Sequence, residues 1–448
     1  MAAVALLLYG AALVTAAVVV WRRPVVAVYA FVVGLAAHNA VMAGLFALGV
    51  RGDPLTAIAA WKEVLLAVAL ARVAWERRLP FRPRFVDGLA LGFGALVVLY
   101  ALLPQSRLGG EADAEGVLYG LRHGLAPVAA YFLGRSLVVP PLRRLVLVAG
   151  AVVAVVGVLE VYLVPIDAWE DADVPEYYAE QLAFEHHGPR GLPENFVFNT
   201  GDEDDLLRRA VSTFLSPLGT AYMLVVALCL WAARPRAAWP LAAVAAVGLL
   251  FTFTRAALLA FAGALVVLAL VRRTWWPALA AAAVVAVGAA WTQAYPTVAP
   301  ETTWSQDDLE WQRAQAERLG VPPGDTVALD EPSIRSHLTA LRDGVETVVE
   351  HPQGYGLGNA GATALRTDVE VKAGESTYTE LGVETGLLGA LAFVAWNVAL
   401  LWGLVRRGAA GTAAAFAAVL AIAVQTDVLG VPWLAYVVWI LAGARLRE

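Results

Sequence analysis

The sequence contains very little cysteine and little charge for its length. A single cysteine, Cys229, stands among 448 residues, which excludes an intrachain disulfide and a cysteine-based metal site. Charged residues make up 16% of the chain, against about a quarter in a typical soluble domain. Because 60% of the residues are hydrophobic, the shortage of charge excludes an ordinary soluble enzyme and indicates an integral membrane protein.

Long apolar runs fill most of the chain, and a helix needs about 20 such residues to cross a hydrocarbon core of about 30 Å. The first run lacks the basic segment that begins a signal peptide, so we expect a retained helix. The sequence predicts an all-α polytopic membrane protein with about 12–13 transmembrane helices. The thirteen candidate spans lie near 2–21, 25–50, 55–75, 85–103, 116–138, 144–165, 210–232, 238–253, 255–271, 275–292, 377–405, 409–425 and 432–446.

Two of these runs, 238–253 and 255–271, are short for two full spans. They form either a tight helical hairpin or one broken element.

Basic residues at alternate junctions between spans predict the orientation. All of them fall on the cytoplasmic side if the N-terminus lies outside and the C-terminus inside, as the positive-inside rule requires. The groups are Arg22-Arg23, Arg77-Arg78 with Arg82 and Arg84, Arg135 with Arg143-Arg144, Arg234 with Arg236, Arg272-Arg273, and Arg406-Arg407.

This orientation leaves three longer segments outside the membrane, at 104–115, 166–208 and 293–376. We therefore expect transmembrane helices 1–10 within 1–292, with an extracytoplasmic loop at 166–208. A large extracytoplasmic loop or cap follows at 293–376, and the C-terminal transmembrane helices occupy 377–448.

A second set of charged residues falls at or just inside the outer membrane face. These residues are Lys62, Glu63, Arg122, Glu160, Arg209, Arg255, Glu375, Glu380 and Glu384. Charges at membrane depth cost about 2.5–3.5 kcal/mol each at a helix centre, and such residues mark sites or pathways by default. Positive charge on this face runs against the positive-inside bias, so an anion such as pyrophosphate is the expected partner of the arginines. The structural alternative is pairing within the set, Lys62 with Glu384 or Arg122 with Glu160.

Other polar groups favour structural roles. His38-Asn39 is expected to hydrogen-bond between helices. Glu185-His186-His187 lacks a fourth spaced metal ligand, and the acidic run 202–205 is typical of a solvated loop. The glycines of 354–358 do not follow a strand and open a helix, so they are no dinucleotide fingerprint. They predict a tight turn and a close backbone approach.

Four stretches resemble the O-antigen ligase and O-antigen polymerase superfamily of membrane glycan transferases. Arg209–Pro217 is similar to the family's Arg-x-x-Gly/Ser-Thr-Phe-x-x-Pro segment, and Phe253–Ala257 to its Ser/Thr-Arg-small-small turn. His351–Asn359 resembles its Pro-x-x-Gly-x-Gly-x-Gly-Asn loop end. Glu375–Tyr378 with Glu384–Gly389 resembles its His-Asn-Ser-Tyr and Glu-x-Gly-x-x-Gly stretch. One departure is Glu375, where ligases for lipid A-core have His; it favours a polymerase or a ligase for another acceptor.

The resemblance implies a glycosyltransferase with a GT-C-like helical fold. It would move a glycan from a polyprenyl-pyrophosphate carrier to a hydroxyl of an acceptor glycan or lipid, outside the cytoplasmic (inner) membrane. No cofactor, metal or nucleic acid is expected, and the reaction would invert the anomeric centre. Arg209 and Arg255 would stabilise the leaving phosphate and Glu375 would act as general base. The expected substrate-binding residues are Lys62, Arg122, Arg335, Tyr378 and Glu384.

A transporter or flippase for an anionic lipid-linked or small anionic substrate is the leading alternative, since it would use the same arginines. The absence of an inverted repeat and of matched broken helices in two halves of the sequence disfavours it. An inactive scaffold in an envelope complex is a third possibility. The sequence leaves the sugar, the acceptor, and ligation versus polymerisation open.

Overall fold

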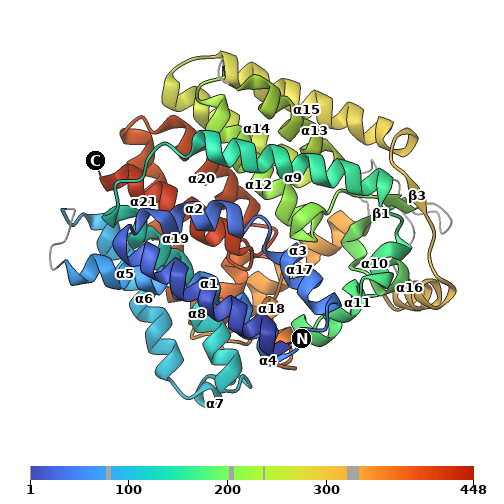
Figure 1. Ribbon diagram of the computed structural model, residues 1–448, viewed down its shortest axis with the longest axis horizontal. Helices are drawn as coiled ribbons and strands as arrows, with labels where there is room; N and C mark the ends of the chain where they lie inside the picture. The colour runs from blue at the N-terminus through green and yellow to red at the C-terminus, as the bar shows by residue number, and fades with distance from the viewer. Residues whose placement is uncertain (1, 77–81, 201–205, 236–237, 320–331, 448) are drawn as a thin grey trace.

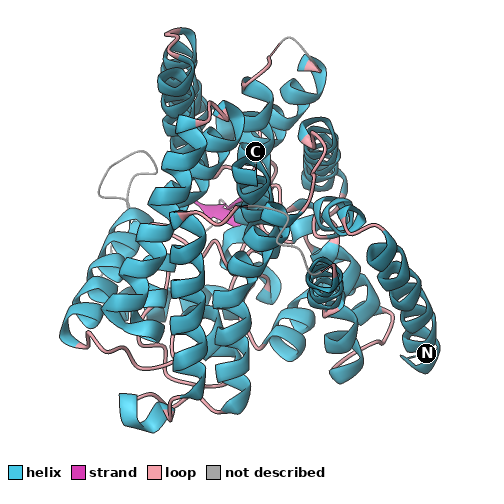
Figure 2. Ribbon diagram, turned by 90° about the vertical axis from the view of Figure 1, so that its left-hand side faces the viewer, coloured by secondary structure: helices cyan, strands magenta, loops and turns pink. Residues whose placement is uncertain are grey.

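The protein is almost entirely helical, as the computed structural model shows over residues 2–76, 82–200, 206–235, 238–319 and 332–447. The side chains of 2–4, 315–319 and 332–336 lie outside the described part. Figure 2 shows helices throughout, with a small patch of strand near the middle of the molecule. The predicted all-α class is confirmed.

The N-terminal third is a run of helices. Its elements are α1 (Ala2–Arg22), α2 (Val25–Gly34), α3 (His38–Ala47), α4 (Asp53–Ala59), α5 (Trp61–Trp75), α6 (Phe85–Leu102), α7 (Gln105–Leu108), α8 (Ala114–Ser136) and α9 (Arg143–Leu163).

Short elements follow, of which α10, α11 and β1 are labelled at the right of Figure 1. They are α10 (Asp167–Asp171), α11 (Val174–Glu176), the π-turn η1 (Tyr177–Gln181), the 3₁₀ turns η2 (Pro189–Gly191), η3 (Glu194–Phe196) and η4 (Ser212–Phe214), and strands β1 (Val197–Asn199) and β2 (Leu206–Arg208).

The remaining elements include helices α16, α17 and α18, which fall in the predicted extracytoplasmic cap. In order they are α12 (Pro217–Ala232), α13 (Trp239–Phe251), α14 (Arg255–Arg272), α15 (Trp276–Ala294), η5 (Tyr295–Thr297), β3 (Glu301–Thr302), α16 (Gln306–Leu319), α17 (Pro332–Glu350), α18 (Gly361–Arg366), α19 (Thr377–Arg406), α20 (Ala410–Ile422), the π-turn η6 (Leu434–Val438) and α21 (Trp439–Arg447).

Fewer helices than the thirteen predicted spans are long enough to cross a membrane unaided. Within the described ranges, six pass by length and composition, or eight if each of two bent pairs is one span. Three predicted spans, α12, α13 and α20, are apolar but shorter. The predicted span at 25–50 is a bent pair of helices, because α2 and α3 meet at a 63° bend. At that bend Gly34 lies against the Trp61 ring, where a Cβ would come within 2.8 Å.

Helix α12 occupies the centre of the bundle. Fourteen of its sixteen residues are buried, and it packs against α9, α13, α14 and α20. Its middle section is apolar on every face, as expected of a helix enclosed by other helices. The turn at its N-terminal end, η4, is therefore anchored to the rigid core.

One end of the bundle gathers the arginines that were predicted to be cytoplasmic. Arg135 is fully buried and its Nε and Nη2 atoms donate to the two oxygens of Asp87, each at 2.9 Å. Its Nη1 donates to the Leu446 carbonyl at 2.6 Å, and Tyr131 donates to Asp87 at 2.6 Å. Arg143 contacts the carbonyl of Arg234, and Arg407 that of Arg445. These contacts join junctions that the positive-inside rule assigns to one face. Arg77, Arg78 and Arg236 lie outside the described residues.

The predicted interhelical role of His38 and Asn39 is confirmed. The Trp61 Nε1 donates to His38 Nδ1 at 3.3 Å, and Asn39 Nδ2 donates to the Phe214 carbonyl at 2.7 Å. These bonds tie α3 to α5 and to η4.

A small antiparallel sheet, in the order β1-β2-β3, holds the segment that leads into η4. Val197 pairs with Arg208 and Leu206 with Thr302. The backbone N–H of Arg209 continues the ladder with a 3.0 Å bond to the Phe196 carbonyl. The backbone at Arg208 and Arg209 is thus fixed on both sides.

Candidate active site

Arg209 and Arg255 come together at the turn between α13 and α14. This turn spans three residues and includes Phe253 at φ 48°. Helix α13 packs on α9 and α12, whereas α14 packs on α12, α15 and α20. The Arg209 Nε donates to the Thr252 carbonyl at 2.9 Å, and its Nη2 donates to Thr254 Oγ1 at 3.1 Å. The residues immediately before and after Phe253 therefore hold the Arg209 guanidinium.

Arg255 is the first residue of α14 and lies over the Phe198 ring at 5.3 Å. It is close enough to Arg209 for the two positive charges to repel. Burial and, to a smaller extent, the charge of Arg255 lower the pKa of Arg209 to about 10. Among the described residues, no carboxylate forms an ion pair with Arg209. The fold therefore brings two cations together at a place where burial disfavours charge.

The neighbouring Arg208 has the opposite environment. Its Nη2 lies 3.1 Å from Glu160 Oε1, and Glu160 Oε2 accepts from the backbone N–H groups of Val211 and Ser212 at 3.2 and 3.4 Å. The pairing of Glu160 with Arg122, weighed from the sequence, does not form. Glu160 instead neutralises Arg208 and fixes the turn that follows Arg209.

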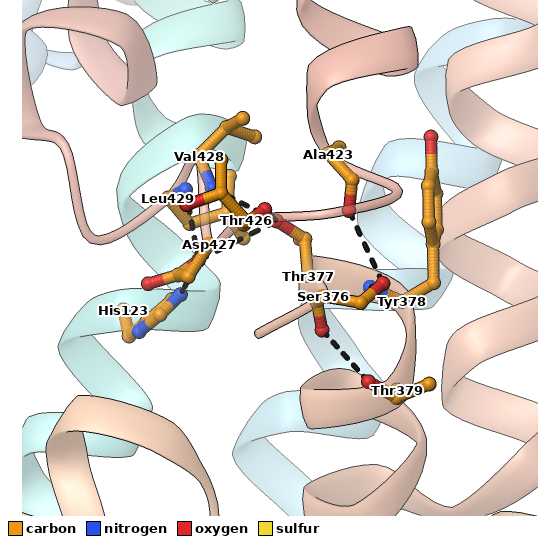
Figure 3. A network of polar contacts seen from close by, with 10 residues as sticks. All are labelled: His123, Ser376, Thr377, Tyr378, Thr379, Ala423, Thr426, Asp427, Val428 and Leu429. Carbon is orange, nitrogen blue, oxygen red and sulfur yellow. Dashed lines mark hydrogen bonds and ion pairs between the residues drawn. The ribbon is translucent and has the colours of Figure 1, made fainter. Parts of the chain in front are cut away.

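A group of carboxylates lies around the start of α19. Glu380 and Glu384 are buried on this helix, and the electrostatic neighbours of Glu380 are Asp427, Glu384 and Glu375. His123 of α8 lies 3.1 Å from Asp427 (Figure 3). The Oε1 of Glu384 accepts from the Gly358 N–H at 2.9 Å.

The segment after α20 holds this start in place, as Figure 3 shows. Thr377 Oγ1 donates to the Thr426 carbonyl at 3.1 Å and accepts from the Val428 N–H at 2.9 Å. Ser376 Oγ donates to the Ala423 carbonyl at 3.2 Å. The backbone of Glu375, immediately before these residues, is therefore set from outside its own helix.

Glu375 itself has a strained backbone and an imidazole partner. Its φ is 68°, in the left-handed region that non-glycine residues seldom occupy. Its Oε2 lies 2.5 Å from Nδ1 of His337, which comes from α17. Strain of this kind is often kept at functional sites. The pair is partly exposed.

The glycine-rich loop makes the close approaches predicted for it. Gly354 has φ 73°, and a Cβ there would lie 2.5 Å from the backbone N of Gly386. Gly358 has φ 84°, and its Cβ would lie 2.6 Å from the backbone carbon of Gly116. Asn359 then accepts from the Glu111 N–H at 2.8 Å. The loop therefore packs between α8 and Gly386, the residue at which α19 has a non-helical backbone conformation.

Lys62 and Arg122 form a second cationic group around Glu63. Lys62 Nζ lies 3.6 Å from Glu63 Oε2, and Arg122 Nε lies 3.7 Å from Glu63 Oε1. The pairing of Lys62 with Glu384, also weighed from the sequence, does not form. Arg366 of α18 is an electrostatic neighbour of both Lys62 and Arg122.

Tyr378, a further predicted residue, lies apart from these groups. The Tyr378 hydroxyl donates to the Leu420 carbonyl at 2.9 Å, and Figure 3 shows its ring directed away from Asp427. Arg335 falls in α17, but its side chain lies outside the described part of the structure. The acidic run 202–205 is also outside it.

The two cationic groups have different neighbours along the segment that follows α20. Tyr222 is an electrostatic neighbour of Arg209 and lies beside Gln425 and Thr426. Asp427 and His123 come next, and the charge of Arg122 acts on His123. Arg209 and Arg255 are thus one group, and Lys62, Arg122 and Arg366 are another.

Sequence reasoning missed His123, His337, Arg366 and Asp427. His123 adjoins Arg122, and His337 lies in a segment with helical periodicity, so both were within reach of inspection. Arg366 and Asp427 had no such signal, because a single charge beside a helix end is a common feature.

These observations define a multi-pass helical membrane protein with charged groups gathered around helix breaks. Residues 240–394, about a third of the chain, match the family model described as O-antigen ligase. The match confirms the resemblance to the O-antigen ligase and polymerase superfamily and supports glycan transfer of that general type. It includes Arg255, the glycine loop and Glu375. No curated protein matches the chain.

Proposed function

We propose that the protein transfers a glycan from a polyprenyl-pyrophosphate carrier to a hydroxyl of an acceptor glycan or lipid. The reaction would take place at the outer face of the cytoplasmic membrane. The observation that carries this proposal is the Arg209 guanidinium, which Thr252 and Thr254 hold beside Arg255. Cations fixed at one point in a water-poor setting suit a phosphate that gains charge as it leaves.

The transfer is a single displacement. The acceptor oxygen forms a bond to the anomeric carbon, and the bond from that carbon to the pyrophosphate oxygen breaks. The pyrophosphate leaves with the electron pair, and Arg209 and Arg255 offset its added charge. The hydroxyl proton passes to a protein base. Such a displacement inverts the anomeric centre, and the arginines supply the positive charge without a metal ion.

Glu375 is the proposed base, together with His337. Their 2.5 Å contact gives the carboxylate a fixed direction and the proton a place to go. A carboxylate where lipid A-core ligases have His therefore keeps an imidazole at the site, brought from α17. The strained φ of 68° at Glu375 points its side chain toward that helix.

Glu384 has a positioning role in this mechanism. Its bond to the Gly358 N–H holds the glycine loop against α8 and α19. Asp427, which also contacts His123, accepts from Thr377 at the start of α19. Both contacts keep Glu375 at a constant place relative to the bundle.

Proteoliposomes containing the purified chain, a lipid-pyrophosphate-linked oligosaccharide and an acceptor glycan test this proposal. New glycosidic bonds are expected, and Glu375→Gln should slow their formation with little change in donor affinity. Movement of the donor across the bilayer without bond formation would instead identify a transporter. Neither bonds nor movement would identify a scaffold.

Glycans of a deletion strain then separate two activities. Long chains that accumulate unattached on the carrier indicate a ligase, and single repeat units indicate a polymerase. Mass spectrometry of the lipid-linked pool distinguishes them.

A further inference from the structure

A second cationic group, apart from the Arg209 and Arg255 pair proposed to bind the donor pyrophosphate (the donor clamp), carries more positive charge than its single carboxylate can offset. Lys62 of α5, Arg122 of α8 and Arg366 of α18 are mutual electrostatic neighbours. Within the described ranges, Glu63 is the one carboxylate at ion-pair distance from any of them. Three cations from three helices thus face a single anionic partner.

Arg366 shows the imbalance most directly. Its Nε atom is buried and has no hydrogen-bond partner among the described residues. Its guanidinium lies over the Phe184 ring at 5.6 Å. Burial lowers the pKa of Arg366, and the charge of Arg122 lowers it further. A buried donor without an acceptor costs about 1–3 kcal/mol, and more when it is charged.

The other nearby carboxylates are engaged elsewhere. Glu115 accepts from the Tyr119 hydroxyl at 2.7 Å. Glu384 accepts from the Gly358 backbone, and Asp427 faces His123. None of these three forms an ion pair with Lys62, Arg122 or Arg366 in the part of the chain that the structure describes.

A cavity of about 310 Å³ lies near this group, and residues next to the three cations, rather than the cations themselves, form part of its wall. Phe184, under the Arg366 guanidinium, is part of its wall. So is His38, on which the charges of Lys62 and Arg122 act. Asn39, His186 and Ser216 add polar atoms to the lining. Its size is at the lower end of the range for small-ligand pockets, about 300–1,000 Å³.

We propose that Lys62, Arg122 and Arg366 form a second anion-binding site, for a phosphate group on a ligand that occupies this cavity. After Glu63 is counted, two positive charges remain. A phosphate monoester carries about −1.5 to −2 at pH 7, which matches them. Arg366 Nε and the free face of Arg122 supply donors in the fork geometry that phosphate prefers.

This site differs from the Arg209–Arg255 pair in place and in consequence. Its cations belong to α5, α8 and α18, whereas Arg209 follows β2 and Arg255 begins α14, so the two sites share no residue. A transferase with both sites could hold a phosphate-bearing acceptor while the donor pyrophosphate is bound.

Equilibrium dialysis with radiolabelled inorganic phosphate tests the proposal without any transfer assay. The full chain is placed in nanodiscs of neutral phosphatidylcholine. Saturable binding is expected, with affinity reduced at least about tenfold by Arg366→Gln and by Arg122→Gln. Arg366→Lys, which keeps the charge, should retain part of the binding. Arg107→Gln removes an exposed cation from the 104–115 segment and should change nothing.

The variant Arg255→Gln separates this site from the donor clamp. Phosphate binding that survives Arg255→Gln but is lost in Arg366→Gln supports the second site even if the proposed transfer fails. Wild-type binding by both Arg366→Gln and Arg122→Gln would overturn it.

Nanodiscs containing phosphatidylglycerol distinguish two sources of the phosphate. Reduced binding of free phosphate in these discs would assign the site to a lipid headgroup. Unchanged binding would assign it to a ligand from the aqueous side.

Discussion

Arg135 and Arg209 are both surrounded by protein, at opposite ends of the bundle, and they have different partners. Arg135 forms two bonds to Asp87 and two more to the backbone carbonyls of Leu446 and Arg82. Arg209 bonds to a backbone carbonyl and a threonine hydroxyl, and its nearest ionic neighbour is the like charge of Arg255. The first arrangement is complete within the protein, whereas the second includes no carboxylate among the residues that the structure describes.

The difference explains why positive charge alone does not identify a site. A buried ion pair with all its hydrogen bonds made has little to offer a ligand, although removal of one partner is costly. A guanidinium held in position without a carboxylate keeps its electrostatic attraction for an external anion. The bonding partners of each arginine, rather than its depth in the protein, therefore distinguish the structural Arg135 from the functional Arg209.

The largest expected effect is the loss of the complete pair. Asp87→Ala leaves Arg135 and the Tyr131 hydroxyl without their acceptor, and the free energy of unfolding should fall by about 3–5 kcal/mol. Denaturation of the purified protein in detergent measures this. The double variant Asp87→Leu with Arg135→Met should recover most of the loss. A single variant within about 1 kcal/mol of wild type would contradict the structural role of this pair.

Arg209→Gln and Arg255→Gln should instead reduce glycan transfer while the protein remains folded. Loss of one fixed donor to a developing charge typically costs about 10²–10³ in turnover. Transfer rates in proteoliposomes, normalised to folded protein, measure the effect. Near-wild-type rates in both variants would exclude the proposed binding of the pyrophosphate by Arg209 and Arg255.

The adjacent Arg208 provides a matched control for Arg209. Arg208→Gln strands the buried Glu160 carboxylate, so it should lower stability by a few kcal/mol, up to about 3–5 kcal/mol. Arg209→Gln should lower stability by no more than about 1–2 kcal/mol, the worth of its hydrogen bonds. Equal losses of stability in both variants would contradict the proposed difference between Arg208, which has a carboxylate partner, and Arg209.

Glu375→Gln should lower turnover by about 10²-fold, at the lower end of the contribution of a general base. His337→Gln should have a smaller effect, because the carboxylate remains. Donor binding should change little in either variant. A Glu375→Gln enzyme with wild-type turnover would exclude this residue as the base.

The smallest expected effect is that of Tyr378→Phe. The lost bond to the Leu420 carbonyl should cost about 0.5–1.5 kcal/mol of stability. Transfer should stay within a few-fold of wild type, because the hydroxyl faces α20 rather than Asp427. A loss as large as that of Arg255→Gln would place Tyr378 on the substrate after all.

The fold class and the helical segments could be predicted from apolar runs, because burial in lipid leaves a strong compositional record. Bends could not be predicted. The 63° break between α2 and α3 depends on Gly34 packing on the Trp61 ring, a contact between separate elements. The loss of helical φ at Gly386 inside α19 likewise depends on the approach of Gly354.

The candidate site could be predicted in part. Charges at membrane depth are rare enough to be noticed, and Arg209 and Arg255 do come together. Which charges pair could not be predicted, because pairing depends on helix rotation. Glu160 forms an ion pair with Arg208, the residue before Arg209, and Lys62 and Arg122 both pair with Glu63. His337 reaches Glu375 through the packing of α17 on α19, a contact between separate elements that no local sequence pattern predicts.

A structure of the protein with a polyprenyl-pyrophosphate lipid bound tests the central claim most directly. The phosphate oxygens should lie within hydrogen-bond distance of the Arg209 and Arg255 guanidinium groups, with the sugar carbon turned toward Glu375. A pyrophosphate found among Lys62, Arg122 and Arg366, or opening to the cytoplasmic end beside Arg135, would contradict the account.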